Sequence, residues 1–507
     1  MSVSTIEAGY PSQARPSGRA ASDRASLHPL VWLYLIAVII PFGFNLGSVT
    51  MTGLRLVLLI TIVPTTLRVL SGQCGRVYPV DILFGLHVIW CAIALTVTSP
   101  HVALENVGAT TTEFLGGYML ARNFIRTRGD MIALIRALLI LVLLSMPLAL
   151  AEARSGVAYI PKFIDDLPVL NSVAQVNIPK RMGLERAQVF FSHPIHYGLF
   201  CSLALSMTYV GLRGLMFGAA RFVSMAAIFL GVFLSLSSGA LLASLLQIGL
   251  IAWSVIFRKY EKRWLYLLLL FATAYVTIDL LSNRTPIKVL MSYATFSAHT
   301  AYWRGIIFEW GMLNVRAHPI FGLGYSKWVR PSFVRSGSVD NFWLATTMRY
   351  GVPGFLFLAA GYLDAILRIG RKKIVGDERL SNLRLAWMIT FTGLSFTLAT
   401  VHIWSAIYSL VFFMLAAGLW IADEPVAGLK ADLPDADADA DAAPTRSGLA
   451  WARAGGGEGS PPLSRSRKGR DPELRRVHEP AASPDPDRAG AASHRYTRFP
   501  ADDDPAA

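Results

Sequence analysis

Long apolar runs alternate with shorter polar segments along most of this sequence. A helix needs about 20 apolar residues to cross a bilayer. Twelve runs come close to this length, at about residues 30–48, 54–70, 80–98, 107–120, 131–151, 190–210, 222–236, 240–257, 265–281, 342–367, 385–401 and 403–421. The pattern predicts an all-α fold, a polytopic transmembrane helical bundle of about twelve spans.

Two polar segments are much longer than the other links. Residues 152–185 follow the fifth run, and residues 282–340 separate the ninth from the tenth. Short basic links are expected on the cytoplasmic side of a membrane protein. These links are residues 68–76, 122–128, 213–221, 258–263 and 368–373. With both chain ends in the cytoplasm, all of them fall on that side, and both long segments fall on the outer face.

The two ends of the chain differ from the apolar region between them. Residues 1–28 form a predicted cytoplasmic N-terminal segment without the pattern of a removable signal peptide. Residues 29–421 form the predicted transmembrane domain. Residues 422–507 contain an alternating Asp-Ala run and then irregular Gly, Pro, Ser and Arg. So few apolar residues cannot offset the cost of ordering, and we expect a disordered cytoplasmic tail.

Composition supports a membrane protein and excludes several other classes. Of the 507 residues, 53% are hydrophobic and only 16% are charged, too few to cover a soluble chain of this size. The basic residues lie mainly in the short links and in the tail, so the net charge of +14 does not indicate nucleic-acid binding. The three cysteines are scattered and predict neither a disulfide framework nor a metal site.

The outer segment 282–340 is strongly basic. Its cations are Arg284, Lys288, Arg304, Arg316, Lys327, Arg330 and Arg335. Only Glu309 and Asp340 oppose them. A cationic surface at a membrane face suits an anionic ligand such as a lipid-linked phosphate. Residues 180–186 form a second basic segment on the same predicted face.

Apolar residues recur at helical spacing across residues 300–316. Trp303, Ile306, Ile307, Trp310 and Leu313 form one stripe, which predicts an amphipathic helix. Tryptophans on such a stripe are typical of a helix that lies in the lipid interface. The same helix would hold Arg304 at headgroup depth, with Trp303 lining the site.

Four polar residues after this helix are candidates with ordinary structural alternatives. His318 lies on the turn that Pro319 and two glycines predict, where a histidine also commonly serves as a structural hydrogen-bond partner. Asp340 precedes the tenth run next to Asn341, and a helix N-cap explains an aspartate there equally well. Arg349 lies within that run, where it either marks a ligand path or reaches back to the headgroups.

The entrance to the sixth run carries a further set of candidates. Arg186 lies just outside the run, and His193 and His196 flank Pro194. Because proline interrupts local helix, this entrance exposes backbone groups that must line a cavity. The two histidines lack an evident third ligand, so we predict no metal there.

Three motifs occur in a recognisable order. They are Arg186, Pro194 and Gly198 at a span entrance; the turn SLSSGA at 235–240; and, around the long outer segment, Trp303, Arg304, His318, Pro319, Gly322, Gly324, Asn341, Leu344, Tyr350, Gly351 and Gly354. The order resembles the O-antigen ligase and Wzy-type polysaccharide polymerase family of bacterial inner-membrane proteins. Two positions depart from the family pattern. Ser238 stands where arginine is frequent, and Asp340 stands where many ligases have histidine, which favours a polymerase.

The resemblance implies a membrane glycosyltransferase that acts at the periplasmic face of the bacterial inner membrane. It would join lipid-linked (undecaprenyl diphosphate) saccharide repeat units into O-antigen or exopolysaccharide by metal-independent inverting transfer, without a cofactor. On this reading Arg186, Arg304 and Arg349 bind the diphosphate. His318 is the first candidate for the base and Asp340 the second, and His193, His196, Trp303 and Asn341 line the saccharide site.

Other functions stay open on the sequence alone. The partners implied are the lipid-linked saccharide, an acceptor saccharide or lipid A-core, membrane lipids, and chain-length regulators or export proteins, but no nucleic acid. An O-antigen ligase would transfer the polysaccharide to lipid A-core. A transporter of a lipid-linked saccharide or another anion is a different class, although no internal repeat is visible. A structural subunit of an export complex would not explain the paired outer cationic segments.

Overall fold

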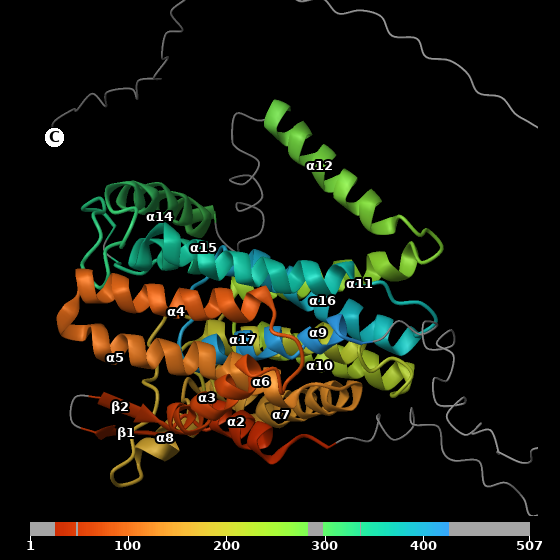
Figure 1. The fold of residues 1–507 in the computed structure, drawn as a ribbon, viewed down its shortest axis with the longest axis horizontal. Coiled ribbons are helices and arrows are strands. Elements are labelled where there is room, and N and C mark those ends of the chain that lie inside the picture. The colour runs from red at the N-terminus through yellow and green to blue at the C-terminus, as the bar shows by residue number, and fades with distance from the viewer. Residues whose placement is uncertain (1–25, 47–48, 282–297, 335, 425–507) are drawn as a thin grey trace, which may run out of the picture. The chain divides into compact units, whose positions relative to one another are not determined.

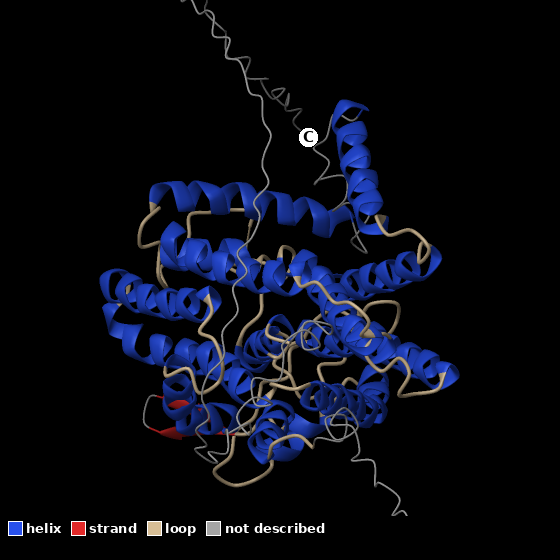
Figure 2. Ribbon diagram, turned by 45° about the vertical axis from the view of Figure 1, so that its right-hand side comes forward, coloured by secondary structure: helices blue, strands red, loops and turns tan. Residues whose placement is uncertain are grey.

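The computed structural model describes residues 26–46, 49–281, 298–334 and 336–424. Most of the predicted N-terminal segment, the first part of the outer segment 282–340 and nearly all of the predicted tail 422–507 lie outside these residues. The described chain is mostly helical, and its strands form one small hairpin (Figure 2). Seven of the described helices are long and apolar enough to cross a membrane, which agrees with a polytopic helical bundle.

Figure 1 labels the elements along the chain. They are α2 (Pro29–Ile39), β1 (Gly43–Leu46), β2 (Val49–Thr52), α3 (Gly53–Leu70), α4 (Pro79–Thr98), α5 (Pro100–Thr111), η1 (Thr112–Gly116), α6 (Gly117–Phe124), α7 (Arg128–Ser155), α8 (Tyr159–Asp165), α9 (Pro194–Tyr209), α10 (Gly218–Leu234), α11 (Ser238–Ile256), α12 (Arg263–Leu281), α14 (Ala298–Ala317), α15 (Phe342–Arg371), α16 (Glu378–Leu398), α17 (Ser405–Ala416) and η2 (Leu419–Ala422). Apolar side chains of α2, α4, α7, α9, α11, α16 and α17 form one continuous core.

The first apolar run is the clearest error of the sequence-based prediction. A span over residues 30–48 is wrong beyond Ile39, because the chain leaves the helix there and forms the antiparallel hairpin β1–β2. Pro41 lacks the N–H that a continuing helix would need. Gly43 of the hairpin instead exchanges two backbone hydrogen bonds with Asn171, at 2.7 and 2.8 Å. Part of the segment after α8 is therefore docked against the hairpin.

Ion pairs join several of the basic links at one end of the bundle. Arg128 pairs with Asp377 at 2.5 Å, and Arg122 pairs with the buried carboxylate of Asp81 at 3.1 Å. Lys372 Nζ donates to the carbonyl of Ala422 at 3.0 Å. The link 122–128 thus contacts Asp377, four residues after the link 368–373 ends.

Helix α15 is interrupted about a third of the way along its length. Gly351 has φ of 75° and ψ of 177°, which no α-helical residue adopts. The segment after α14 fills the interruption. The N–H groups of Leu323 and Gly324 donate to Met348 O and Arg349 O, and Val352 N donates to Pro319 O. Backbone groups that the break would leave unpaired inside the membrane region are thereby satisfied.

Two glycines permit this close approach of two backbones. A Cβ atom on Gly322 would lie 2.6 Å from both Gly351 N and Met348 O. A Cβ atom on Gly351 would lie 1.9 Å from Ile320 O, and its positive φ also disfavours any other residue. The HisPro…GlyxGly and Tyr-Gly-x-x-Gly motifs therefore meet in space, and their glycines have a structural explanation.

Candidate active site

The segment that carries Arg186 is fixed from both sides. Its backbone donates from Glu185 N to Ala153 O at the end of α7 and from Ala187 N to Leu234 O at the end of α10, each at 3.0 Å. The buried carboxylate of Glu152 accepts two more bonds, from Gln188 N and Val189 N, both at 2.9 Å. Residues 185–189 thus have little freedom, and the backbone position of Arg186 is defined before any ligand binds.

The turn between α10 and α11 orients two arginines. Arg186 Nε donates to Ser235 O at 3.3 Å, and Arg181 Nη1 donates to Leu236 O at 2.7 Å. Gly198 of α9 packs so closely on this turn that an added Cβ would lie 2.4 Å from Ser235 Oγ. Two of the sequence motifs, the span entrance and the SLSSGA turn, therefore form one support for the guanidinium groups.

Arg304 is presented by α14. This helix packs along α15, where Gly311 contacts Leu344 and Met348 closely enough that a Cβ would lie 2.7 Å from Leu344 Cδ2. Arg304 is half-buried, and its Nε atom is shielded from solvent without a hydrogen-bond partner in the described structure. A buried guanidinium N–H without a partner carries a desolvation cost that an incoming acceptor could relieve.

The pKa values of the two predicted arginines, Arg186 and Arg304, are affected by the same neighbouring charge, that of Arg181. Burial, followed by the charge of Arg181, lowers the pKa of Arg186 to about 10. Burial also lowers the pKa of Arg304, Arg181 again contributes, and the carboxylate of Asp340 acts in the opposite direction. Arg181 thus lies within electrostatic reach of both. With a pKa of about 10, Arg186 stays charged at neutral pH.

Asp340 faces this cluster and does not cap the helix. The N-cap of α15 is Asn341, whose Oδ1 accepts from Leu344 N at 3.0 Å, so the interpretation of Asp340 as the cap is wrong by one residue. Asp340 Oδ1 accepts from Ser338 Oγ at 2.9 Å. Its charge acts on Arg304 and also raises the pKa of His193. The carboxylate therefore lies between the α14 arginine and the entrance of α9.

Three histidines surround Trp404 beside the carboxylate. The ring of Trp404 lies 4.0 Å from His196, 5.8 Å from His402 and 5.9 Å from His193, measured between centroids. Burial lowers the pKa of His193 to about 4, with a further contribution from the charge of Arg186. Burial, followed by the charge of Arg349, also lowers the pKa of His402 to about 4. His193 and His402 are therefore neutral at pH 7.

Arg349 reaches the same region from inside α15. Its guanidinium lies over the ring of Tyr325, 4.6 Å from the centroid, and its charge acts on His402. Helix α15 is interrupted at Gly351, two residues after Arg349. Arg349 therefore lies within electrostatic reach of His402, which contacts Trp404.

Two other predicted residues lie at different places. His318 is exposed just beyond α14, 14 residues after Arg304, which corresponds to about 21 Å of helix. The structure does not bring His318 to Asp340 and the arginines. Trp303 is next to Arg304 in sequence and contacts Phe333, with 6.0 Å between ring centroids.

The sequence analysis missed several residues of this site. Arg181 was counted only as part of a basic segment, and Glu152 only as a segment boundary. His402 and Trp404 lie in the loop between α16 and α17, most of which the predicted spans 385–401 and 403–421 covered. Among these missed residues, only Glu152 had a sequence signal, because it is a charged residue at the end of an apolar run.

The arrangement is suited to a polyanion with more than one phosphate. The guanidinium groups are those of Arg181, Arg186 and Arg304, and the carboxylate of Asp340 acts on Arg304. The free terminal nitrogens of Arg186 have no hydrogen-bond partner among the described residues. Within the same part of the chain, no group of three or more His, Cys, Asp or Glu side chains is arranged to hold a metal ion.

Comparisons with known proteins agree with the motifs. A family model described as O-antigen ligase matches residues 223–359, which run from α10 into α15 and contain Arg304, Asp340 and Arg349. No curated protein matches the chain. Residues 223–359 of this chain are therefore similar to the O-antigen ligase family, which confirms the resemblance that the order of the motifs predicts.

Proposed function

We propose that this protein is a membrane glycosyltransferase that polymerises saccharide repeat units carried on undecaprenyl diphosphate, at the periplasmic face of the bacterial inner membrane. The observation that carries the proposal is that Arg186 and Arg181 both bind the α10–α11 turn, at 3.3 and 2.7 Å, with Arg181 within electrostatic reach of Arg304. The match of residues 223–359 to the O-antigen ligase family supports a saccharide-transfer reaction of this type.

In the proposed reaction, a hydroxyl of the acceptor saccharide attacks the anomeric carbon of the donor. The new glycosidic C–O bond forms as the bond between that carbon and the diphosphate oxygen breaks. The electron pair goes to the diphosphate, whose negative charge increases, and the configuration at the anomeric carbon inverts. Charged donors already in position stabilise this change in the transition state, because they need no reorganisation.

The guanidinium groups suit the leaving diphosphate. Arginine presents a planar fork that matches phosphate oxygens and keeps its charge. Arg186 and Arg304 are proposed to hold the diphosphate, with Arg181 adding to the positive potential. Arg349 is proposed to contribute from the far side of His402. Undecaprenyl diphosphate is the leaving product, so no nucleotide or further activation is required.

For the acceptor proton, Asp340 is favoured over His318. Asp340 acts electrostatically on both Arg304 and His193, whereas His318 lies about 21 Å along α14 from Arg304. A base must be within hydrogen-bond reach of the hydroxyl it deprotonates. The neutral His193 is proposed to help orient that hydroxyl, with His196 and Asn341 supporting the walls of the site.

A ligase that transfers finished polysaccharide to lipid A-core is the second candidate, because the matching family model carries that description. The two activities need the same donor chemistry and differ in the acceptor. A deletion strain distinguishes them. Loss of chain extension with intact attachment to lipid A-core supports the polymerase, and the reverse phenotype supports the ligase.

A transfer assay with the purified full-length protein in detergent tests the enzymatic proposal against transport. We expect saccharides from a lipid-linked donor to be joined, with release of undecaprenyl diphosphate and without added nucleotide. A transporter cannot yield this product, because it only moves substrate between two compartments. Absence of joined product from protein that still binds the donor would contradict the enzymatic proposal.

A further inference from the structure

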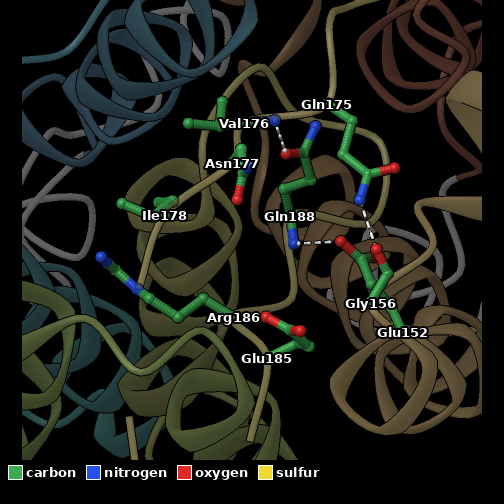
Figure 3. Close-up of a pocket in the computed structure, with 9 residues that line it drawn as sticks. All are labelled: Glu152, Gly156, Gln175, Val176, Asn177, Ile178, Glu185, Arg186 and Gln188. Atoms are coloured by element: carbon green, nitrogen blue, oxygen red, sulfur yellow. Dashed lines mark hydrogen bonds between the residues drawn. The ribbon is translucent and has the colours of Figure 1, made fainter. Parts of the chain in front are cut away.

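A polar cavity adjoins the arginine cluster on the side of α7. It has a volume of about 330 Å³, within the range of roughly 300–1,000 Å³ typical of small-molecule sites. Figure 3 shows Glu152, Gly156 and Gln188 on one side and Asn177, Ile178 and Arg186 on the other. Arg186 is therefore part of the cationic cluster and also lines this cavity.

The rear wall of the cavity is held by its own hydrogen bonds. Gln188 is buried; its Oε1 accepts from Val176 N at 2.9 Å, and its Nε2 donates to Phe191 O at 3.0 Å. Glu152 accepts from Gln188 N, and Gln175 Nε2 donates to Gly156 O (Figure 3). These groups are already satisfied, so they shape the cavity and are less available to a ligand.

The groups still available lie at the opening. Asn177 is exposed and has no hydrogen bond in the described structure. The carboxylate of Glu185 is paired at 3.1 Å with Lys180, a residue whose side chain is 64% exposed, and it retains acceptor capacity. Arg186 offers its terminal nitrogens. Ile178 adds an apolar patch beside these three polar side chains.

This combination fits a neutral sugar ring better than a second anion or an apolar group. An amide, a carboxylate and a guanidinium together offer donors and acceptors, and sugar hydroxyls need both. The carboxylate of Glu185 would repel another phosphate. The patch at Ile178 can pack against the C–H face of a ring. The volume accommodates a small number of sugar units at most.

We propose that this cavity is a subsite for a neutral sugar residue of the donor, close to the diphosphate. The inference rests on the proposed function, because it assumes that Arg186 holds that diphosphate. The donor is favoured over the acceptor because Arg186 lines the cavity, whereas Asp340 and His193, which face the proposed acceptor hydroxyl, do not. Of the polar residues at the opening, Asn177 and Glu185 are not part of the family motifs in the sequence.

Binding of two probes tests the subsite with the full-length protein. The probes are bare undecaprenyl diphosphate and undecaprenyl diphosphate that carries one saccharide repeat unit of the host. The wild type should bind the saccharide-bearing lipid more tightly. Asn177→Ala and Glu185→Gln should each weaken binding of that probe by about five- to tenfold, as loss of a hydrogen bond predicts. Their affinity for the bare lipid should stay unchanged.

Two further variants sharpen the test. Ile178→Trp fills the cavity from its open side and should abolish the preference for the saccharide-bearing probe without affecting the bare lipid. Glu105→Gln changes an exposed carboxylate of α5 outside the cavity and should behave as wild type. Melting temperatures of all variants check that the fold is retained.

The outcomes separate failure of the subsite from failure of the proposed function. A wild type that binds neither probe overturns the proposed function. Equal wild-type affinity for both probes, or a preference that survives Asn177→Ala, Glu185→Gln and Ile178→Trp, overturns the subsite alone. Equal loss of both probes in a folded cavity variant also overturns it, because the cavity would then serve the diphosphate itself.

Discussion

Replacement of Arg304 with alanine is expected to lower the rate of saccharide transfer by about 10²–10³-fold, the usual cost of removing one donor aimed at developing charge. Arg304→Lys keeps the positive charge but loses the planar fork, so its rate should fall between those of Arg304→Ala and the wild type. The measurement is release of undecaprenyl diphosphate by purified protein from a lipid-linked donor.

Arg316→Ala is the matched control for this effect. Arg316 lies on the same helix, α14, but is exposed near its other end, outside the arginine cluster. The control should keep wild-type turnover and a wild-type melting temperature. Full activity in both Arg304 variants would remove this residue from the diphosphate role, whatever the behaviour of the control.

Asp340→Asn is expected to lower turnover by about 10²–10⁴-fold, the usual contribution of a general base. The amide keeps the size of the side chain but cannot take the proton of the acceptor hydroxyl. Asp340→His restores a base and should recover part of the loss. Steady-state rates at saturating donor measure these effects, and affinity for the bare lipid diphosphate should not decrease, because a negative charge is removed.

Two comparisons make this prediction specific. His318→Ala should stay close to the wild type, since His318 lies far from Arg304 along α14. Asp166→Asn, at an exposed position just after α8, controls for loss of a carboxylate elsewhere in the chain. If His318→Ala loses turnover while Asp340→Asn does not, the assignment of the base has to be reversed.

The helical bundle could be predicted because apolar run length is a local property. The hairpin after α2 could not, since Phe42, Phe44 and Leu46 extend the apolar run beyond the end of the helix. Its strands are defined by pairing with each other and with Asn171, which is more than a hundred residues away from Gly43. Gly351 and Pro353 were the only sequence signals for the break in α15. The hydrogen-bond partners of the interrupted backbone lie in residues 319–324, which precede the helix in sequence.

The candidate site was partly predictable for a related reason. Arg186 and Arg304 stood out as basic residues in outer segments, and their order matched family motifs. Arg181 did not stand out, because its contact with Leu236 O depends on how the α10–α11 turn packs. Whether Asp340 or Asn341 caps α15 depends on a one-residue difference in the helix start, which lies below the precision of sequence patterns.

The central claim is that Arg186 and Arg304 bind the same diphosphate. A double-mutant cycle tests it directly, with the dissociation constant of bare undecaprenyl diphosphate measured for the wild type, Arg186→Ala, Arg304→Ala and the double variant. We predict that each single variant binds more weakly and that the two losses are coupled by at least about 0.5 kcal/mol, as expected for groups in one network. Wild-type affinity in either single variant, or losses that simply add, would contradict a shared site.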